Sequence, residues 1–371
     1  MRIGIDARIS YYSGAGIGQY TKQLIRALSQ VATTDEFTIL QSRKDQSSLV
    51  DHPRFRRRSL WTPSHHRLEQ LTLPLEVALA DVQLLHSPDF IPPFRRKCKS
   101  VITIHDLAFL LYPNLLTRES ARYYSQIDEA TRRTDHIIAV SESTKRDIMR
   151  LLGVHDKYVT VIHEAADPIY RPLDRGEAAA WVQDRYHLVG KYVLFMSTIE
   201  PKKNLPMLLQ AFRQMLDTYH IKAKLVVAGD RGWLFEDVFQ TVERLKLSED
   251  VIFLGRVTNE ELLNLYNAAQ VLVHPALYEG FGLTPLEAMA CGTPVIVSNA
   301  SSLPEVVGDA GLLVDPKDPE DLAVAMARVL TTPELQQELR HKGLRRAKNF
   351  SWAKAAAQTL ELYHRLNGHC S

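Results

Sequence analysis

Cysteine is scarce in this chain of 371 residues, which holds only Cys98, Cys291 and Cys370. An odd, sparse set without the spacing of a zinc site argues against a disulfide framework and for a reducing compartment. No uncharged apolar run approaches the roughly 18 residues of a membrane span. The first residues, Met-Arg-Ile-Gly-Ile-Asp, form a strand pattern rather than an apolar leader. These absences predict a cytoplasmic protein, at most peripheral at the inner face of the plasma membrane.

Two ways of holding phosphate groups are also missing. The chain contains neither a G-x-x-x-x-G-K-[ST] loop nor any Asp-x-Asp pair, and Asp-x-Asp is a common metal anchor in metal-dependent transferases. We therefore expect no metal and no cofactor apart from a substrate. A phosphate ligand would have to be held by basic side chains and by backbone N–H groups.

Charge of either sign is not in large excess, because the formal net charge is +2. Basic and aromatic residues are not interleaved, so we do not expect a nucleic-acid binder. The charge is uneven, since residues 1–172 carry 24 Lys and Arg against 19 Asp and Glu. This excess, which includes Arg54-Phe-Arg-Arg-Arg58, favours contact with an acceptor or an anionic membrane surface. A merely solvated surface is the alternative.

Short apolar runs alternate with helical patterns along the first half of the chain. This alternation is typical of a mostly parallel sheet with helices on both faces. Ser141 or Ser143 is a suitable N-cap for a helix that ends at Gly153. Strands are predicted at Arg2–Ala7, Phe37–Leu40, Val82–His86, Val101–His105, His136–Val140 and Tyr158–Ile162, and an amphipathic helix at Ile17–Ser29.

A second α/β series follows a pause at Asp167-Pro-Ile-Tyr-Arg-Pro-Leu173, which we interpret as a linker. The chain is therefore predicted to contain two doubly wound, Rossmann-like domains, with a boundary at residues 172 and 173 and with ligands at the carboxyl ends of strands facing a cleft. A final amphipathic helix covers Trp352–Leu366. The second set of strands is predicted at Tyr192–Ser197, Lys224–Ala228, Val251–Leu254, Val271–His274, Pro294–Ser298 and Gly311–Val314.

A glycine loop, Ser13-Gly-Ala-Gly-Ile-Gly18, joins the first strand to the first helix. Gly14, Gly16 and Gly18 allow the backbone to approach a ligand closely beside a helix N-terminus. The spacing is G-x-G-x-G, and no acidic residue ends the next strand, so the pattern departs from the dinucleotide fingerprint. A mobile turn with no ligand is the alternative interpretation.

A basic pair follows the first strand of the second series, in Glu200-Pro-Lys-Lys-Asn204. Lys202 and Lys203 are flexible point charges that could neutralise a diphosphate. Cations at a helix start oppose its dipole, and an anionic ligand would remove that conflict. Two solvated lysines are the alternative.

Two glutamates, Glu279 and Glu287, flank a Gly-Phe-Gly loop and the start of a helix. A helix N-terminus can hold a diphosphate, and carboxylates accept hydrogen bonds from sugar hydroxyls. Thr284 is predicted as the N-cap with Pro285 as the first helical residue, so Thr284 and Glu287 form a capping box that competes with a ligand role for Glu287. Glu279 has no such structural explanation. The spacing therefore suits a nucleotide sugar.

These motifs make the chain recognisable: it resembles the retaining glycosyltransferases of family four, which have the two-domain GT-B fold. The resemblance covers nearly the whole chain and implies that residues 352–371 return to the N-terminal, acceptor-side domain, leaving 173–351 to bind the donor. The matching segments are Glu279-Gly-Phe-Gly-Leu-Thr-Pro-Leu-Glu287, Ala288–Val295, Leu303-Pro-Glu305, Gly311–Pro316, Glu200–Asn204, Gly255-Arg-Val257 and Val140-Ser-Glu-Ser143.

The resemblance also implies roles in donor binding. Glu287 would hold the ribose hydroxyls, Glu279 the transferred hexose, and Lys203 the diphosphate, with Lys202 as its helper. The backbone at Arg256 and Val257 would meet the base. Backbone N–H groups that would touch the hexose or phosphate belong to Phe281, Gly282, Leu283 and Thr284.

On the acceptor side, the resemblance implies that Gly16 approaches the phosphates or acceptor and that His105 lies near the transferred sugar. A satisfied buried histidine is the alternative for His105, and Asp106 is expected to cap the next segment. Two departures stand out. Many members have Gly-Arg where this chain has Ser197-Thr198, and many have Asn-Gly near Glu164.

The implied activity is transfer of a hexose, with retention and without metal, from a nucleoside diphosphate sugar to a saccharide or lipid-linked saccharide in surface polysaccharide synthesis. UDP-glucose is weakly favoured over GDP-mannose as the donor. A sugar-nucleotide epimerase on the same fold and a non-catalytic nucleotide-sugar-binding subunit are the alternatives.

Overall fold

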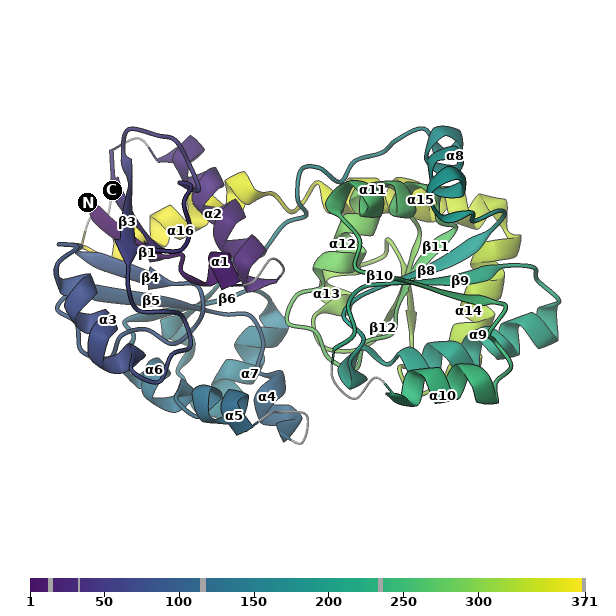
Figure 1. The fold of residues 1–371 in the computed structure, drawn as a ribbon, viewed down its shortest axis with the longest axis horizontal. Coiled ribbons are helices and arrows are strands. Elements are labelled where there is room, and N and C mark those ends of the chain that lie inside the picture. Colours follow the sequence, from purple (N-terminus) through teal and green to yellow (C-terminus); the bar gives the residue numbers. More distant parts are fainter. Residues whose placement is uncertain (13–15, 33, 114–117, 233–235, 369–371) are drawn as a thin grey trace. The chain divides into compact units, whose positions relative to one another are not determined.

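The computed structural model describes residues 1–12, 16–32, 34–113, 118–232 and 236–368 (Figure 1). The chain divides into two compact units. Unit 1 comprises Met1–Glu164 together with Ser351–Ser371, and unit 2 comprises Ala165–Phe350. The boundary predicted at residue 172 therefore lies inside unit 2, because the linker residues fold with the second sheet.

Unit 1 is built on a seven-stranded parallel sheet with the strand order β3-β2-β1-β4-β5-β6-β7. All six predicted strands are present. The seventh, β3, was not predicted, because its arginines hide the strand pattern. The strands are β1 (Arg2–Asp6), β2 (Glu36–Ser42), β3 (Phe55–Leu60), β4 (Leu84–Ser87), β5 (Lys99–Ile104), β6 (His136–Ala139) and β7 (Val159–Val161).

The helices of unit 1 follow the capping rules at α7, where Ser141 accepts a hydrogen bond from the Thr144 N–H and Gly153 ends the helix at φ 64°. The last helix, α16, packs on α2. A hydrogen bond joins the Tyr363 hydroxyl of α16 to Nδ1 of His86 in β4 (2.6 Å). The helices are α1 (Ile9–Tyr12), α2 (Ile17–Val31), α3 (Glu69–Ala78), α4 (Ala108–Leu111), α5 (Arg118–Tyr124), α6 (Ile127–Arg133), α7 (Glu142–Leu152) and α16 (Trp352–Leu366).

Unit 2 contains a six-stranded parallel sheet with the order β10-β9-β8-β11-β12-β13. All six predicted strands are present. They are β8 (Tyr192–Met196), β9 (Lys224–Ala228), β10 (Val251–Gly255), β11 (Val271–His274), β12 (Val295–Ser298) and β13 (Leu312–Val314). The helices are α8 (Arg175–Tyr186), η3 (Pro201–Lys203), α9 (Leu205–Tyr219), α10 (Glu236–Arg244), α11 (Asn259–Ala268), α12 (Leu283–Ala290), α13 (Leu303–Val307), α14 (Pro319–Thr331) and α15 (Pro333–Ala347).

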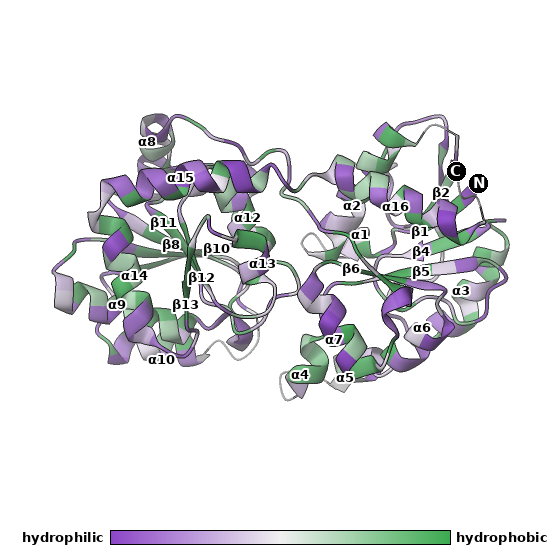
Figure 2. Cartoon of the chain, turned by 180° about the vertical axis from the view of Figure 1, so that it is seen from behind, coloured by the Kyte–Doolittle hydropathy of each residue, from purple (hydrophilic) through white to green (hydrophobic). Residues whose placement is uncertain are grey.

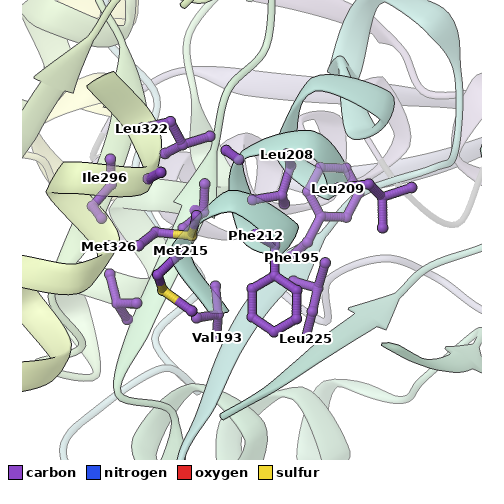
Figure 3. Packing of buried hydrophobic residues seen from close by; sticks show 14 of the residues in the cluster. Val193, Phe195, Leu208, Leu209, Phe212, Met215, Leu225, Ile296, Leu322 and Met326 are labelled. Carbon is purple, nitrogen blue, oxygen red and sulfur yellow. The ribbon is translucent and has the colours of Figure 1, made fainter. Parts of the chain in front are cut away.

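The core of unit 2 lies between its sheet and the helices α9 and α14 (Figure 3). Val193 and Phe195 of β8 contribute side chains that are fully buried against Leu208 and Phe212 of α9 and Met326 of α14. Strands buried on both faces are almost wholly apolar, which is why the sequence pattern located them correctly.

In both sheets the strand order reverses once, between β1 and β4 in unit 1 and between β8 and β11 in unit 2. Ligands of doubly wound sheets bind outside the carboxyl ends of the strands at this switch point. A ligand site is therefore expected at the loops after β8 and β11 in unit 2. In unit 1 it is expected at the loops after β1 and β4. None of the helices in the described ranges is long and apolar enough to span a bilayer.

Candidate active site

The carboxylate of Glu279 is the centre of the switch point in unit 2. Its Oε1 atom accepts from the ammonium of Lys203, which follows β8, and from Nε2 of His274, the last residue of β11 (2.7 Å). Its backbone N–H donates to Oγ of Ser301 (2.8 Å). Predicted site residues from two loops distant in sequence thus meet at one carboxylate oxygen.

Glu279 is held ionised by its neighbours. Burial alone would raise the pKa of Glu279, but the ammonium of Lys203 and the hydrogen bond from His274 outweigh it and hold that pKa well below its usual range. The Glu279 and Lys203 side chains are each only 13% exposed. Such a pair is a fixed, oriented dipole at a poorly solvated position. A sugar hydroxyl or a phosphate bound there would interact with it strongly.

His274 was not predicted as a site residue. Its side chain is buried, and its Nδ1 atom lacks a hydrogen-bond partner among the described residues. The carboxylate of Glu279 can only accept, so His274 donates to it through Nε2. A histidine ending an apolar strand five residues before Glu279 was the available signal.

The lysine loop is fixed to the glutamate loop by backbone contacts. The Leu277 N–H donates to the carbonyl of Lys202 (2.8 Å). Asn204, at φ 61°, donates from Nδ2 to the carbonyls of Pro275 (3.1 Å) and Pro316 (2.8 Å). These bonds hold the two lysines at the glutamate loop, while their contact with a diphosphate stays a prediction.

Lys202 has its own carboxylate partner. Its ammonium lies 3.5 Å from Oε1 of the buried Glu200. Burial raises the pKa of Glu200, and the charges of Lys202 and Lys203 act in the opposite direction. Two Lys–Glu pairs therefore occupy this switch point, and an incoming diphosphate would compete with Glu200 and Glu279 for the two ammonium groups.

The start of α12 differs from the prediction, and the capping box is wrong. The N-cap is Gly282 at φ 113°, not Thr284, and no side chain caps the helix. A Cβ at Gly282 would lie 2.9 Å from Leu303 Cδ2, so glycine is required both for the backbone conformation and for space. Without a side-chain cap, the first turn presents N–H groups at the positive end of a helix.

Phe281 precedes the N-cap Gly282, and Leu283 and Thr284 are the first two helical residues; their predicted backbone contacts with the hexose or phosphate stay a prediction. Ser302 steadies the loop, because its hydroxyl lies 2.9 Å from the carbonyl of Glu279 and 2.6 Å from that of Phe281. The loop that follows β11 is thus pre-formed, with Glu279 at one end and the α12 N-terminus at the other.

Glu287 lies one turn into α12 and makes no capping bond. Instead, the hydroxyl of Tyr266 in α11 donates to its Oε2 (3.1 Å). Burial raises the pKa of Glu287 to about 8, the hydrogen bond from Tyr266 lowers it, and the nearby charge of Asp167 raises it. The ligand interpretation of Glu287 therefore loses its strongest competitor.

The loops after β9 and β10 contain the predicted base contacts. Arg256 is exposed, with its Nε atom 3.9 Å from Oδ2 of Asp230, and Val257 follows it. At Gly229 the loop after β9 comes very close to the loop after β8, since an added Cβ would lie 2.0 Å from the Ser197 carbonyl oxygen. The sheet brings these residues to the same edge as Glu279.

In unit 1, His105 is tied on both sides. Nδ1 lies 2.8 Å from the Glu164 carboxylate, and Nε2 lies 3.0 Å from the carbonyl of Pro88. Both partners are acceptors, so both ring nitrogens donate and the ring is an imidazolium. Burial would lower the pKa of His105, but the Glu164 hydrogen bond outweighs it and the pKa is raised. The satisfied-histidine interpretation is the one that the ring contacts fit.

Two other predictions concern unit 1. Asp106 caps the next segment, since its Oδ1 accepts from the Ala108 N–H (3.0 Å). Gly16 precedes α2 at φ 52°, and a Cβ there would meet nothing within 4 Å, which leaves room beside a helix N-terminus. Gly14 lies outside the described residues. Arg57 and Arg58 of the basic stretch donate to the carbonyls of Asp45 and Leu79.

A charged cluster at the switch point of unit 1 was missed. Arg8, fully buried, donates to both carboxylate oxygens of Asp6 (2.9 and 2.7 Å) and to Glu69 (2.5 Å). Beside it, His65 at φ 60° bonds Asp89 and stacks on a tyrosine ring. Only Asp6 and Arg8, directly after a strand, carried a sequence signal. No group of three or more candidate metal ligands occurs among the described residues.

Each unit matches a described family. Residues 188–346 match Glycosyl transferases group 1, and residues 14–169 match Glycosyltransferase Family 4. O-antigen chain mannosyltransferase B from Escherichia coli is 32% identical over 373 residues, 95% of this chain and 96% of its own. Serotype-specific mannosyltransferase WbdA from Escherichia coli is 31% identical over 273 residues, 72% of this chain but 34% of its own, so the chain spans about a third of that relative.

Among solved structures, a sucrose-phosphate synthase from Thermosynechococcus elongatus is similar with a TM-score of 0.81 at 21% identity, over 100% of both chains. Two doubly wound units, shared with glycosyltransferase structures that cover nearly the whole chain, define the GT-B class of glycosyltransferases. Within that class, this chain belongs to glycosyltransferase family 4.

Proposed function

We propose that this enzyme transfers a hexose, with mannose favoured, from a nucleoside diphosphate sugar to a saccharide or lipid-linked saccharide acceptor in surface polysaccharide synthesis. The observation that carries the proposal is the contact of Lys203 and His274 with one oxygen of Glu279 at the switch point. It combines a cation for a diphosphate with an oriented carboxylate for a sugar hydroxyl. The proposal replaces UDP-glucose with GDP-mannose as the favoured donor.

The preference for mannose rests on the relatives. The relative matched over nearly the full length of both chains is named as an O-antigen chain mannosyltransferase. The base contacts expected at Arg256 and Val257 are largely backbone, so side chains there discriminate little between guanine and uracil. UDP-glucose is therefore the competing donor in the test below.

In this mechanism, Lys203, Lys202 and the N-terminus of α12 stabilise the charge that develops on the leaving diphosphate. These groups supply positive charge where other enzymes use a metal, and we include metal independence in the proposal. The ammonium of Lys203 already lies against Glu279, so it links the phosphate to the carboxylate that would hold the hexose. Activity that survives chelation of divalent ions by EDTA would support this part.

For retention, we propose that the departing phosphate accepts the proton of the acceptor hydroxyl on the same face of the sugar. Glu279 is an unsuitable nucleophile, because its Oε1 is engaged by two donors and its lowered pKa weakens its basicity. The anomeric configuration of the product, read by NMR, tests retention. A covalent glycosyl adduct on Glu279 would overturn this assignment.

The decisive experiment is a donor panel scored by thermal shift and by nucleotide release with and without a saccharide acceptor. We expect GDP-mannose to stabilise the protein most and to release GDP only with an acceptor. Conversion of the donor without an acceptor would favour the epimerase, and binding without release under all conditions would favour the non-catalytic subunit. No response to any nucleotide sugar would overturn the proposal.

A further inference from the structure

Helix α3 exposes a row of leucines. Leu71, Leu75 and Leu79 are 66%, 69% and 71% exposed, and Leu68, which precedes the helix, is also exposed. Residues three and four apart lie on one face of a helix, so these four form a single stripe, here called the leucine face. Monomeric soluble proteins rarely leave a contiguous apolar patch of this kind uncovered without a functional reason.

The leucine face is additional to the side by which α3 packs on its sheet. Leu73 and Val77 face inward and pack with Leu60 of β3. The helix is therefore apolar on two sides, and the inner one already supplies its share of the core. The outer leucines are largely exposed and are not part of this core.

The two acidic residues of α3 do not lie free beside the leucines. Glu69 is buried and bonds Arg8. Glu76 accepts from the backbone N–H groups of Trp61 (2.6 Å) and Thr62 (3.1 Å). The remaining exposed residues of the helix, Thr72 and Ala78, are uncharged. Both carboxylates of the helix are thus bound within unit 1, and the Glu69 carboxylate is neutralised by Arg8.

Basic and aromatic groups border the leucine face. Along β3, Arg56 and Arg58 point to the same side of the sheet as Leu60, and Arg58 donates to the carbonyl of Leu79 at the end of α3 (2.7 Å). Trp61 is 71% exposed and is joined to α3 through Glu76. The guanidinium of Arg43 lies over its ring, 3.9 Å from the ring centroid. Figure 2 shows α3 and its hydrophobic residues in green.

We propose that the leucine face docks unit 1 on an anionic membrane, with α3 lying in the plane of the interface and Trp61 at headgroup level. Helices that bind in this way combine an apolar side with flanking cations, and tryptophan prefers the interface. The phosphates of anionic lipids complement the arginines of β3. The exposed acid that follows the leucine face, Asp81, pairs with Arg2 (3.3 Å), so the arginines beside α3 still favour an anionic surface over an uncharged apolar groove.

This inference deepens the proposed function, since docking would bring the enzyme to a lipid-linked acceptor. It rests on the proposed function only for the identity of the acceptor at the membrane. Lipid binding can be measured without any donor or acceptor, so the two proposals can fail separately.

The test is co-sedimentation of the full chain with vesicles of phosphatidylcholine alone or mixed with phosphatidylglycerol. We expect strong binding only to the anionic vesicles, weakened but not abolished by added salt, because screening reduces the charge contribution alone. The variant Leu71→Gln/Leu75→Gln should lower the partition constant at least about tenfold. Arg56→Gln should reduce the dependence on salt.

The matched control is Val189→Gln, an equally exposed apolar residue of unit 2, which should leave binding unchanged. Because Leu71 and Leu75 are exposed, their double variant should keep the melting temperature and the rate of transfer to a water-soluble acceptor. The proposal is overturned by absent binding to anionic vesicles, or by binding that the leucine changes do not alter. Self-association that depends on these leucines, without vesicle binding, would assign the face to a second copy of the chain.

Discussion

The contact between Lys203 and Glu279 makes a quantitative prediction. Replacing Lys203 by Gln leaves the carboxylate of Glu279 with His274 as its remaining donor. Both side chains of the pair are only 13% exposed, so water does little to compensate. Removing one partner of a largely buried pair costs about 3 kcal/mol of unfolding free energy. For a unit the size of Ala165–Phe350 this lowers the melting temperature by roughly 6–12 °C.

Urea denaturation of the wild type, Lys203→Gln, Glu279→Gln and the double variant measures the coupling. We expect the double variant to recover most of the stability lost in Lys203→Gln, because no uncompensated charge is left behind. Lys342→Gln is the matched control, since Lys342 pairs with Glu338 at the surface and its loss should change stability little. A double variant as unstable as Lys203→Gln, or a single variant as stable as the wild type, would refute the reasoning.

The same pair predicts that the folding stability of the protein falls as the pH is lowered. The pKa of Glu279 is lower in the folded protein than in the unfolded chain. Its contribution to stability is therefore present above the unfolded pKa of about 4.3 and is lost as the pH falls toward the folded value. Glu279→Gln should flatten the decline of stability in that range. A decline that is equally steep in the variant would contradict the assignment.

Three further predictions concern other residues. Glu164→Gln should lower the pKa of His105, as measured by NMR titration, because the variant loses the carboxylate that raises this pKa. In the wild type, the stability that His105 contributes should be complete below about pH 6.5 and should be lost as the pH rises through the folded pKa. With a pKa of about 8, Glu287 should release a proton when it accepts ribose hydroxyls, so calorimetry should show donor affinity rising up to about tenfold per pH unit until about pH 8. Gly229→Ala should destabilise unit 2 by at least about 3 kcal/mol in urea, because its Cβ would collide with backbone.

The fold was largely predictable from the sequence, because strands buried on both faces are read directly as apolar runs. All the predicted strands of both sheets are present. The strand β3 was not predicted, because it is an edge strand and arginines such as Arg56 and Arg58 interrupt its apolar pattern. The domain boundary was placed too late, since prolines mark a break in secondary structure but not the division between two cores.

The candidate site was predictable in its parts but not in its pairings. The lysine and glutamate motifs are local, so Lys203 and Glu279 could be named. Their contact, and the bond from His274, depend on the lateral order of β8 and β11, which the sequence does not state. The capping box at Thr284 failed because Gly282 adopts a left-handed conformation and starts α12 earlier, a choice that only the packing against Leu303 explains.

The return of α16 to unit 1 has a consequence for synthesis on the ribosome. Every residue of unit 2 has been translated once Phe350 is made, whereas unit 1 still lacks the helix that bonds His86 through Tyr363. Unit 2 is therefore complete in a chain that ends at Phe350, whereas unit 1 is not. A released chain truncated after Phe350 should protect the second sheet from protease better than the first.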